Sequence, residues 1–242
     1  MQFSTSINHG LGAYAVGRWN FNEGSGVTAK DSSGFNNHGN IYNAIWRCAS
    51  DDRDYTPSGA GCSLEFAGVI SSYIEILDSL DLYNKKITIQ AWIKPIAYSL
   101  EGIIACKRWI PGYFFRLYRY TGRIEGYVHI EGDSQDWRGC VGPENKVARL
   151  NQWSHVVLTY DGENVKVYLN AEEICSQYFL GEIGYGDPPV RIGFYFSSTG
   201  DHQVFTGLID EVAIYDQPLS PAQIKKLYVE GLKKLNLSLE DI

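Results

Sequence analysis

Hydrophobic and polar positions alternate along residues 207–216, and this alternation predicts a β-strand. Leu208, Val212 and Ile214 share one face at a period of two, and the same face carries the carboxylate of Asp210. Because a buried carboxylate without partners costs several kcal/mol, we expect Asp210 to be ion-paired, hydrogen-bonded or bound to a metal. The opposite face is also partly apolar, so the strand is expected to be covered on both sides.

A short helix is predicted directly after this strand. Ser220 suits the N-cap, Pro221 suits the first helical position, and Gln223 occupies the reciprocal position of a capping box. An apolar stripe then follows at helical spacing, made of Ile224, Leu227 and Tyr228.

The rest of the chain predicts further strands and no second domain. Turn signals such as Thr-Gly, Asp-Gly and Gly-Asp separate several of them. The segment 22–40 is rich in Gly, Ser, Asn and Asp, so we expect no regular element there. Strands are expected at residues 13–21, 63–66, 73–76, 87–94, 102–106, 113–120, 123–131, 153–160, 164–170, 190–196 and 205–216.

Four segments carry a family resemblance. They are WNFNEGSG with its DSSG continuation from Trp19, ITIQAWIKP from Ile87, QWSHVVLTYDGENVKVYLN from Gln152, and GLIDEVAIYDQPLSPAQI from Gly207. Together they resemble the laminin-G-like jelly rolls of the concanavalin A-like lectin/glucanase superfamily. The resemblance implies an all-β, two-sheet antiparallel jelly-roll sandwich with one short C-terminal helix. It divides the chain into an N-terminal extension (1–12), the jelly-roll domain (13–231) and a C-terminal tail (232–242) that either extends the helix or frays.

Charge and hydropathy narrow the classes of partner. The 242-residue chain has a formal net charge of −7, which disfavours binding to a nucleic-acid backbone. The sequence contains no run of about 20 apolar residues, so no membrane-spanning segment is predicted. No signal peptide is visible at the start of the chain. The resemblance implies an extracellular or cell-surface protein, whose export segment would then not be present in this chain.

The five cysteines do not form a C-x-x-C pair, so a zinc cluster is disfavoured, and the odd number leaves one thiol over. Cys48 and Cys62 bracket a polar loop that a disulfide would stabilise by restricting the unfolded chain. The alternative is that both are small, buried apolar residues.

A structural calcium site is a second expectation. Ca²⁺ takes six to eight oxygen ligands from carboxylates, amides and carbonyls, and the Gly-rich segment 22–40 offers several. Many members of the resembled superfamily hold such an ion between an N-terminal loop and an acid of the last strand. The alternative is that the two aspartates only cap turns by accepting backbone hydrogen bonds. The candidate ligands, carried over by position, are Asn22, Glu23, Asp31, Asn37, Gly39 and Asp210.

Two catalytic functions remain as alternatives. The retaining glucanases of the superfamily place their carboxylates on one strand, and Glu131–Asp136 imitates that spacing within a segment that reads as a loop. A polysaccharide lyase would need an arginine for a uronate, with tyrosine and histidine for proton transfer. Arg116, Tyr127 and His129 supply these residue types on two strands that we expect to pair, but the local lyase signatures are missing.

Sugar binding needs aromatic faces together with nearby charged and amide groups. For each tryptophan the alternative is packing in the core or beneath a loop. The candidate ligand-binding residues are Trp92, Trp109, Tyr113, Arg116, Tyr118, Tyr127, His129 and Trp137.

The sequence therefore predicts a non-catalytic module that binds carbohydrate or a partner protein on an exported or cell-surface protein, with a structural calcium ion. The expected partner is a glycan or a surface protein. The alternatives are a polysaccharide-active enzyme, lyase before glycosidase, and a structural or adhesive surface subunit.

Overall fold

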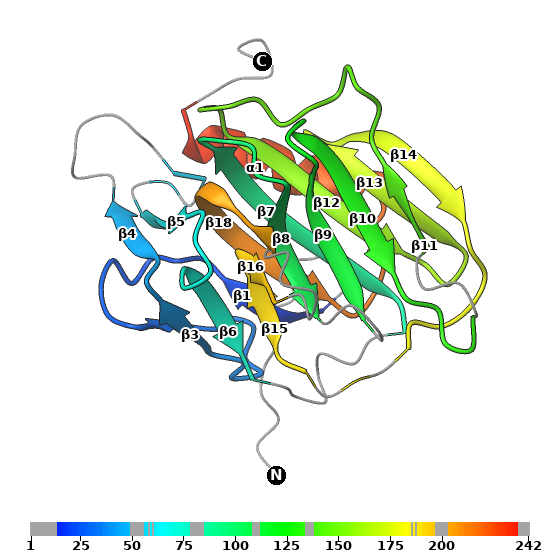
Figure 1. The fold of residues 1–242 in the computed structure, drawn as a ribbon, viewed down its shortest axis with the longest axis horizontal. Coiled ribbons are helices and arrows are strands. Elements are labelled where there is room, and N and C mark those ends of the chain that lie inside the picture. The colour runs from blue at the N-terminus through cyan, green and yellow to red at the C-terminus, as the bar shows by residue number, and fades with distance from the viewer. Residues whose placement is uncertain are drawn as a thin grey trace.

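The computed structural model describes residues 14–48, 56–57, 59, 61–77, 85–107, 112–133, 138–184, 186, 188–196 and 203–236. Two large antiparallel sheets pack face to face, and one helix, α1 (Pro221–Lys234), follows the last strand (Figure 1). This confirms the predicted jelly-roll sandwich. Among the described residues, no helix is long and apolar enough to cross a membrane.

The first sheet is built around the last strand, β18. Its order is β14 (Glu172–Tyr178), β13 (Asn164–Leu169), β12 (Ser154–Tyr160), β7 (Ile87–Pro95), β18 (Thr206–Tyr215), β5 (Cys62–Ala67) and β4 (Ile45–Cys48). The first strand, β1 (Ala15–Trp19), also pairs with β18, so the beginning and the end of the domain lie side by side.

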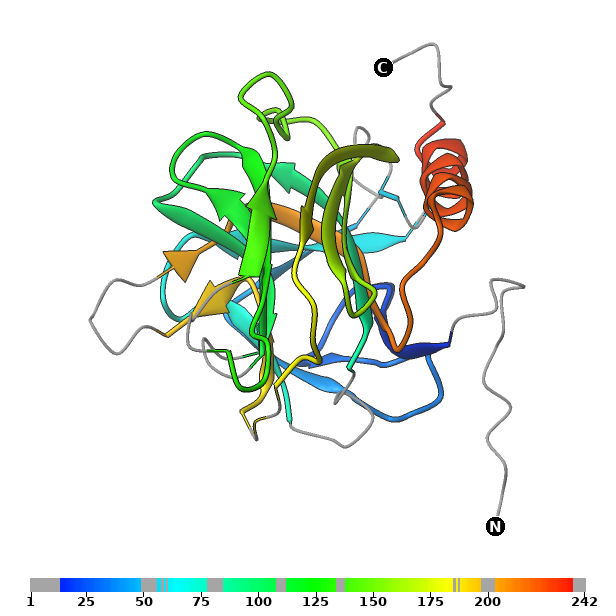
Figure 2. The ribbon, with the colours of Figure 1, turned by 90° about the vertical axis from the view of Figure 1, so that its right-hand side faces the viewer.

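The second sheet faces the first across the core. Its order is β11 (Arg138–Val141), β10 (Arg123–Val128), β9 (Tyr113–Tyr118), β8 (Glu101–Lys107), β15 (Val190–Ile192), β6 (Tyr73–Ile76), β3 (Gly39–Tyr42) and β2 (Thr28–Ala29). Two short strands, β16 (Phe194–Tyr195) and β17 (Gln203–Val204), pair with each other and contact β8. Figure 2 shows these two strands and α1 on opposite sides of the sandwich.

The structure differs from the sequence-based elements mainly at the edges of the sheets. Strands β2, β3, β4, β11, β14 and β17 were not anticipated, and β2 and the start of β3 fall in the segment expected to be irregular. An edge strand has one neighbour and exposes much of its surface, so its apolar periodicity is weak. In β14, for example, no residue is fully buried.

Two disulfides connect neighbouring elements. Cys48 pairs with Cys62 across β4 and β5, which confirms the predicted bridge. Cys140 pairs with Cys175 and joins the edge strands of the two sheets, β11 and β14. The remaining thiol, Cys106, is buried, and burial raises its pKa to about 12. It therefore stays protonated and is a poor nucleophile.

Helix α1 begins with the predicted capping box. Ser220 caps the helix and its side chain accepts from the backbone N–H of Gln223, whose own side chain accepts from the Ser220 N–H. The helix continues through residues 232–234 of the predicted tail. Residues 1–13 and 237–242, which include the predicted N-terminal extension, lie outside the described part of the chain.

A buried layer forms where α1 covers the first sheet. The ring of Trp92 lies 5.3 Å from His155 and 5.7 Å from Tyr228 of the helix, measured between centroids. His155 is fully buried, and its Nε2 lies 3.0 Å from Oε1 of Gln90. Burial lowers the pKa of His155 to about 3, so the imidazole is neutral and donates from Nε2 to Gln90.

This burial predicts a specific acid sensitivity. The unfolded chain protonates His155 near its ordinary pKa of 6.5 and the folded chain only near 3, so this residue's contribution is complete above about pH 6.5 and falls toward pH 3. We expect the free energy of unfolding of the wild type to fall more than that of His155→Gln between about pH 7.5 and about pH 4.5. Urea titration at both pH values measures this. His38→Gln, which changes an exposed histidine, is the control. Equal losses in wild type and His155→Gln would contradict the assignment.

Candidate functional site

The predicted polar patch forms on the outer face of the second sheet. Strands β9 and β10 pair with Arg116 opposite Glu125 and with Tyr127 opposite Phe114. Because side chains alternate across a strand, these residues and Tyr118 all point away from the core. The expectation that the two strands pair and share a polar face is therefore confirmed.

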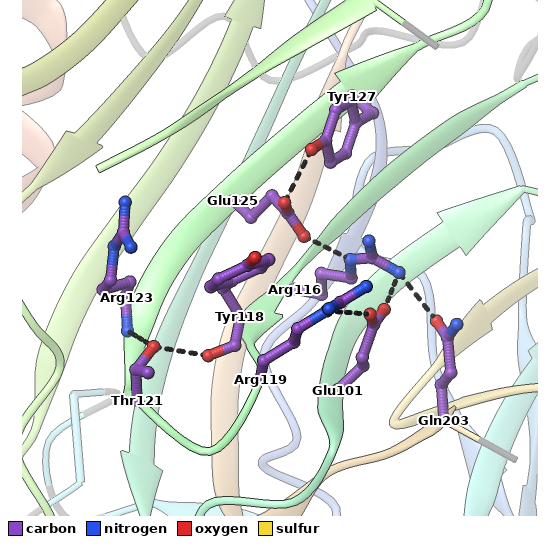
Figure 3. A network of polar contacts seen from close by, with 9 residues as sticks. All are labelled: Glu101, Arg116, Tyr118, Arg119, Thr121, Arg123, Glu125, Tyr127 and Gln203. Carbon is purple, nitrogen blue, oxygen red and sulfur yellow. Dashed lines mark hydrogen bonds and ion pairs between the residues drawn. The ribbon is translucent and has the colours of Figure 1, made fainter. Parts of the chain in front are cut away.

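Arg116 is the centre of a network that joins four strands (Figure 3). Its Nε donates to Oε2 of Glu125 at 2.6 Å, and its Nη1 donates to Oε1 of Gln203 at 3.0 Å. Nη1 also forms an ion pair with Glu101 of β8. The Tyr127 hydroxyl donates to the second carboxylate oxygen of Glu125 at 2.6 Å.

The charged members of this network are buried. Arg116 is 6% exposed, Glu101 is 7% exposed and Glu125 is 1% exposed. Burial and the hydrogen bond to Glu125 raise the pKa of Tyr127, so its hydroxyl keeps its proton at neutral pH. Both carboxylates already balance the charge of Arg116. The guanidinium is therefore not placed to neutralise the carboxylate of a substrate, which disfavours the lyase alternative.

A row of aromatic rings lies on the same face. We call Tyr42, Tyr73, Phe194 and Phe196 the aromatic row. Tyr42 stacks on Tyr73 with ring centroids 4.6 Å apart, and Tyr73 lies 5.4 Å from Phe194. The row ends at Phe196, which is 59% exposed, and Tyr42 is 39% exposed at the other end.

Charged groups lie beside the aromatic row. Arg191 of β15 donates from Nε and Nη2 to Oε2 of Glu75, at 2.9 and 2.7 Å. Its guanidinium carbon lies 6.0 Å from the centroid of the Tyr73 ring. Both side chains are partly exposed. The outer face therefore combines exposed aromatic surface with a hydrogen-bonding ion pair.

The aromatic row was not predicted, because its rings come from strands far apart in the chain. The Tyr73–Ile76 strand was correctly predicted, and the period of two in a strand puts Tyr73 and Glu75 on one face. Tyr42 and Phe194 join them only because β3 pairs with β6 and because β16 folds back over the sheet. No local pattern carries that information.

The remaining candidate binding residues are spread over the molecule. Trp92 belongs to the first sheet and is covered by α1, so it does not share a groove with Arg116. Tyr113 is 2% exposed and packs in the core between the sheets. His129 is half-buried and follows β10 directly. Trp109 and Trp137 lie outside the described residues.

The predicted calcium ligands already have protein partners, and Asp31 shows this best. Its Oδ1 accepts from the backbone N–H groups of Arg18 and Ser33, and its Oδ2 accepts from the Ser33 hydroxyl and the Asn37 N–H, at 2.7–2.9 Å. These four bonds fill the acceptor sites of one carboxylate. Asp31 thus caps the turn that follows it.

The other candidate ligands are also engaged. Asn22 accepts from the Cys62 N–H, Glu23 accepts from the Lys30 N–H, and the buried Asp210 accepts from the Glu211 N–H. Gly39 is part of the β2–β3 ladder. Within the described ranges, no group of three or more His, Cys, Asp or Glu residues could hold a metal ion. These residues do not fit a calcium site as they are arranged, and the site stays a prediction.

Comparisons with known proteins agree with the fold. A laminin G family model, described as the concanavalin A-like lectin/glucanases superfamily, matches residues 67–225. No curated protein matches the chain. A similar solved structure is domain 4 of AbnA, a GH43 extracellular arabinanase from Geobacillus stearothermophilus, in complex with arabinotriose. It has 21% identity and a TM-score of 0.68, over 89% of this chain and 98% of that chain.

Two toxin structures are similar at 15% identity. They are the binding domain of Paraclostridial Mosquitocidal Protein 1, with a TM-score of 0.69, and the binding domain of botulinum neurotoxin serotype G, with a TM-score of 0.67. They cover 89% and 88% of this chain, which spans only 52% and 50% of theirs. At these identities the likeness shows the fold alone.

In the Arg116 network, substitutions of neighbouring residues should have non-additive effects on the free energy of unfolding. Arg116→Met leaves Glu125 buried without its cation and leaves Glu101 with only the exposed Arg119, 3.8 Å away, so we expect it to destabilise the fold by about 3–5 kcal/mol. The double variant Arg116→Met/Glu125→Gln should be less destabilised than the sum of its single variants, because it removes one of the two carboxylates. Urea denaturation of the three variants measures this. Additive effects would show that the network is not coupled.

Substitution of Asp31 distinguishes the two predicted roles of this residue, which are turn cap and calcium ligand. As a turn cap, Asp31→Ala should lose about 1–3 kcal/mol, with the same loss in excess calcium and in chelator. A calcium ligand would instead make the wild-type melting temperature depend on calcium, since about 100 times the Kd adds about 2.7 kcal/mol. The arrangement of donors around Asp31 leads us to expect the first result. A calcium-dependent melting temperature that Asp31→Ala abolishes would confirm the metal.

Proposed function

Because this chain belongs to the concanavalin A-like lectin/glucanases superfamily, we propose that it is a non-catalytic carbohydrate-binding module. We place its binding surface at the aromatic row on the outer face of the second sheet. The observation that carries the proposal is the exposed stack of Tyr42 on Tyr73 beside the Arg191–Glu75 pair. Aromatic rings pack against the C–H faces of sugars, while charged groups bond to the hydroxyls.

The chemistry of the face supports binding rather than catalysis. Glycosidases need two carboxyl groups placed on either side of the scissile bond. Here Glu101 and Glu125 are committed to Arg116, and Glu75 is committed to Arg191. Asp133 of the glucanase-like segment forms an ion pair with Arg138 at 2.6 Å, and residues 134–137 lie outside the described part. Glu101, Glu125, Glu75 and Asp133 are thus all engaged in ion pairs.

We also propose that the module acts outside the cell. Two disulfides join its strands, and disulfides persist mainly in oxidising compartments. A glycan ligand is favoured over a protein partner because a similar domain of an extracellular arabinanase was solved with arabinotriose. An adhesive role would instead require a partner protein at this face.

The proposal is tested by isothermal titration with arabinotriose and a panel of neutral oligosaccharides. We expect Tyr42→Ala to weaken binding by about two- to tenfold, the loss expected for one aromatic contact. Tyr178→Ala is the matched control, because Tyr178 is 63% exposed but lies on β14 of the other sheet. It should bind as the wild type does. Equal affinity of both variants, or binding of a protein ligand only, would overturn the assignment of this face.

A further inference from the structure

A hollow lies beside α1 and the first sheet, away from the aromatic row. Its volume is about 690 Å³, and it lies between the helix and the connection from β11 to β12. The residues of interest on its wall are Asn145, Lys146, Arg149, Asn151, Gln152 and Trp153. We call it the basic groove.

The charge of this groove is opposite to that of the chain. Lys146 and Arg149 line it together with Lys94, and Glu172 is the carboxylate on its wall. Lys146 pairs with Glu172 at 2.5 Å, and Arg149 forms no ion pair with the described residues. The formal net charge of the whole chain is −7. A local excess of cations on an acidic protein attracts an anionic ligand.

The groove also presents polar groups that have no partner among the described residues. The side-chain amides of Asn145, Asn151 and Gln152 form no hydrogen bond within the described residues. All three side chains are exposed, so in the free protein they bond to water, and a ligand that displaces this water can take its place.

The segment that carries these side chains is fixed in place. The Ala148 N–H donates to the Gly122 carbonyl at 2.9 Å, and the Tyr98 hydroxyl donates to the Ala148 carbonyl at 2.7 Å. The Asn151 N–H donates to the Pro95 carbonyl at 2.7 Å. Ala148 is completely buried. A groove held in this way loses little conformational entropy when a ligand binds.

We propose that the basic groove binds an oligosaccharide that carries carboxylate or sulfate groups. The cations pair with its acidic groups, and the side-chain amides bond to its hydroxyl and ring oxygens. The volume accommodates more than a single small anion. An acidic peptide would also satisfy the cations, but a sugar ring presents hydroxyl groups more densely than a glutamate-rich peptide presents backbone amides, so the sugar makes fuller use of the row of side-chain amides.

The test is isothermal titration with a uronic-acid trisaccharide, a sulfated trisaccharide and the carboxyl-reduced, neutral form of the first. We expect the wild type to bind at least one acidic sugar, more weakly as the salt concentration rises, and to bind the neutral form least. Lys146→Gln/Arg149→Gln should lose about tenfold or more in affinity. Lys30→Gln/Lys225→Gln changes the net charge equally at two exposed positions outside the groove and should bind as the wild type does.

A third variant tests the site without removing a cation. Asn151 has a φ of 59°, and aspartate tolerates this left-handed conformation, so Asn151→Asp should fold normally. Its new negative charge should weaken binding of the acidic sugar. Circular dichroism and the melting temperature verify the fold of each variant.

Several outcomes would overturn the proposal. These are no binding of either acidic sugar, equal binding of acidic and neutral forms, equal losses in the groove and control double variants, and equal binding of a glutamate-rich peptide. The proposal is independent of the aromatic row. Tyr42→Ala should leave binding of the acidic sugar unchanged, so a failure at one surface is distinguishable from a failure at the other.

Discussion

The pairing of β18 with three other strands is the interaction on which the rest of the sandwich depends. Its first part pairs with β5 and its last part with β1, while β7 lies along its other edge. A bulge between Asp210 and Ala213 separates the two parts, and Glu211 there has a φ of 48°. The bulge lets β18 pair with both β1, at the start of the domain, and β5, which carries Cys62. The buried Asp210 is accommodated because its Oδ1 accepts the Glu211 N–H at the bulge itself.

Polar side chains in this protein are used mainly to fix loops and strands. Asp31 gathers four donors around one turn, and Arg116 joins four strands through two carboxylates and an amide. These residues are of the types that carry out catalysis or bind metals, but their hydrogen-bonding and ion-pairing groups already have partners in the protein. Surfaces whose side chains still have unused hydrogen-bonding groups or exposed rings are better candidates for ligand binding. By this criterion the aromatic row offers ring faces, and the basic groove offers amides and cations.

The sequence predicted the fold because the strongest signals are local. The alternation at 207–216, the capping box at Ser220 and the resembled segments all lie within short stretches of chain. The same was true of the Cys48–Cys62 bridge, whose residues bracket one loop. The site was only partly predictable. Arg116 and Tyr127 lie on consecutive strands, so their meeting follows from a hairpin. The aromatic row is built from strands that are distant in sequence, and its residues carry no periodic pattern of their own. The named residues of the basic groove lie in one segment, 145–153, but the helix and the strands that complete its wall come from elsewhere in the chain.

The Cys140–Cys175 bridge has a consequence for how the domain resists force. It connects the outermost strand of one sheet to the outermost strand of the other. The covalent ring so formed, residues 140–175, includes the segment that lines the basic groove. While this disulfide is intact, tension on the chain cannot separate these two edge strands, and the part of the groove wall formed by residues 145–154 stays attached to both sheets.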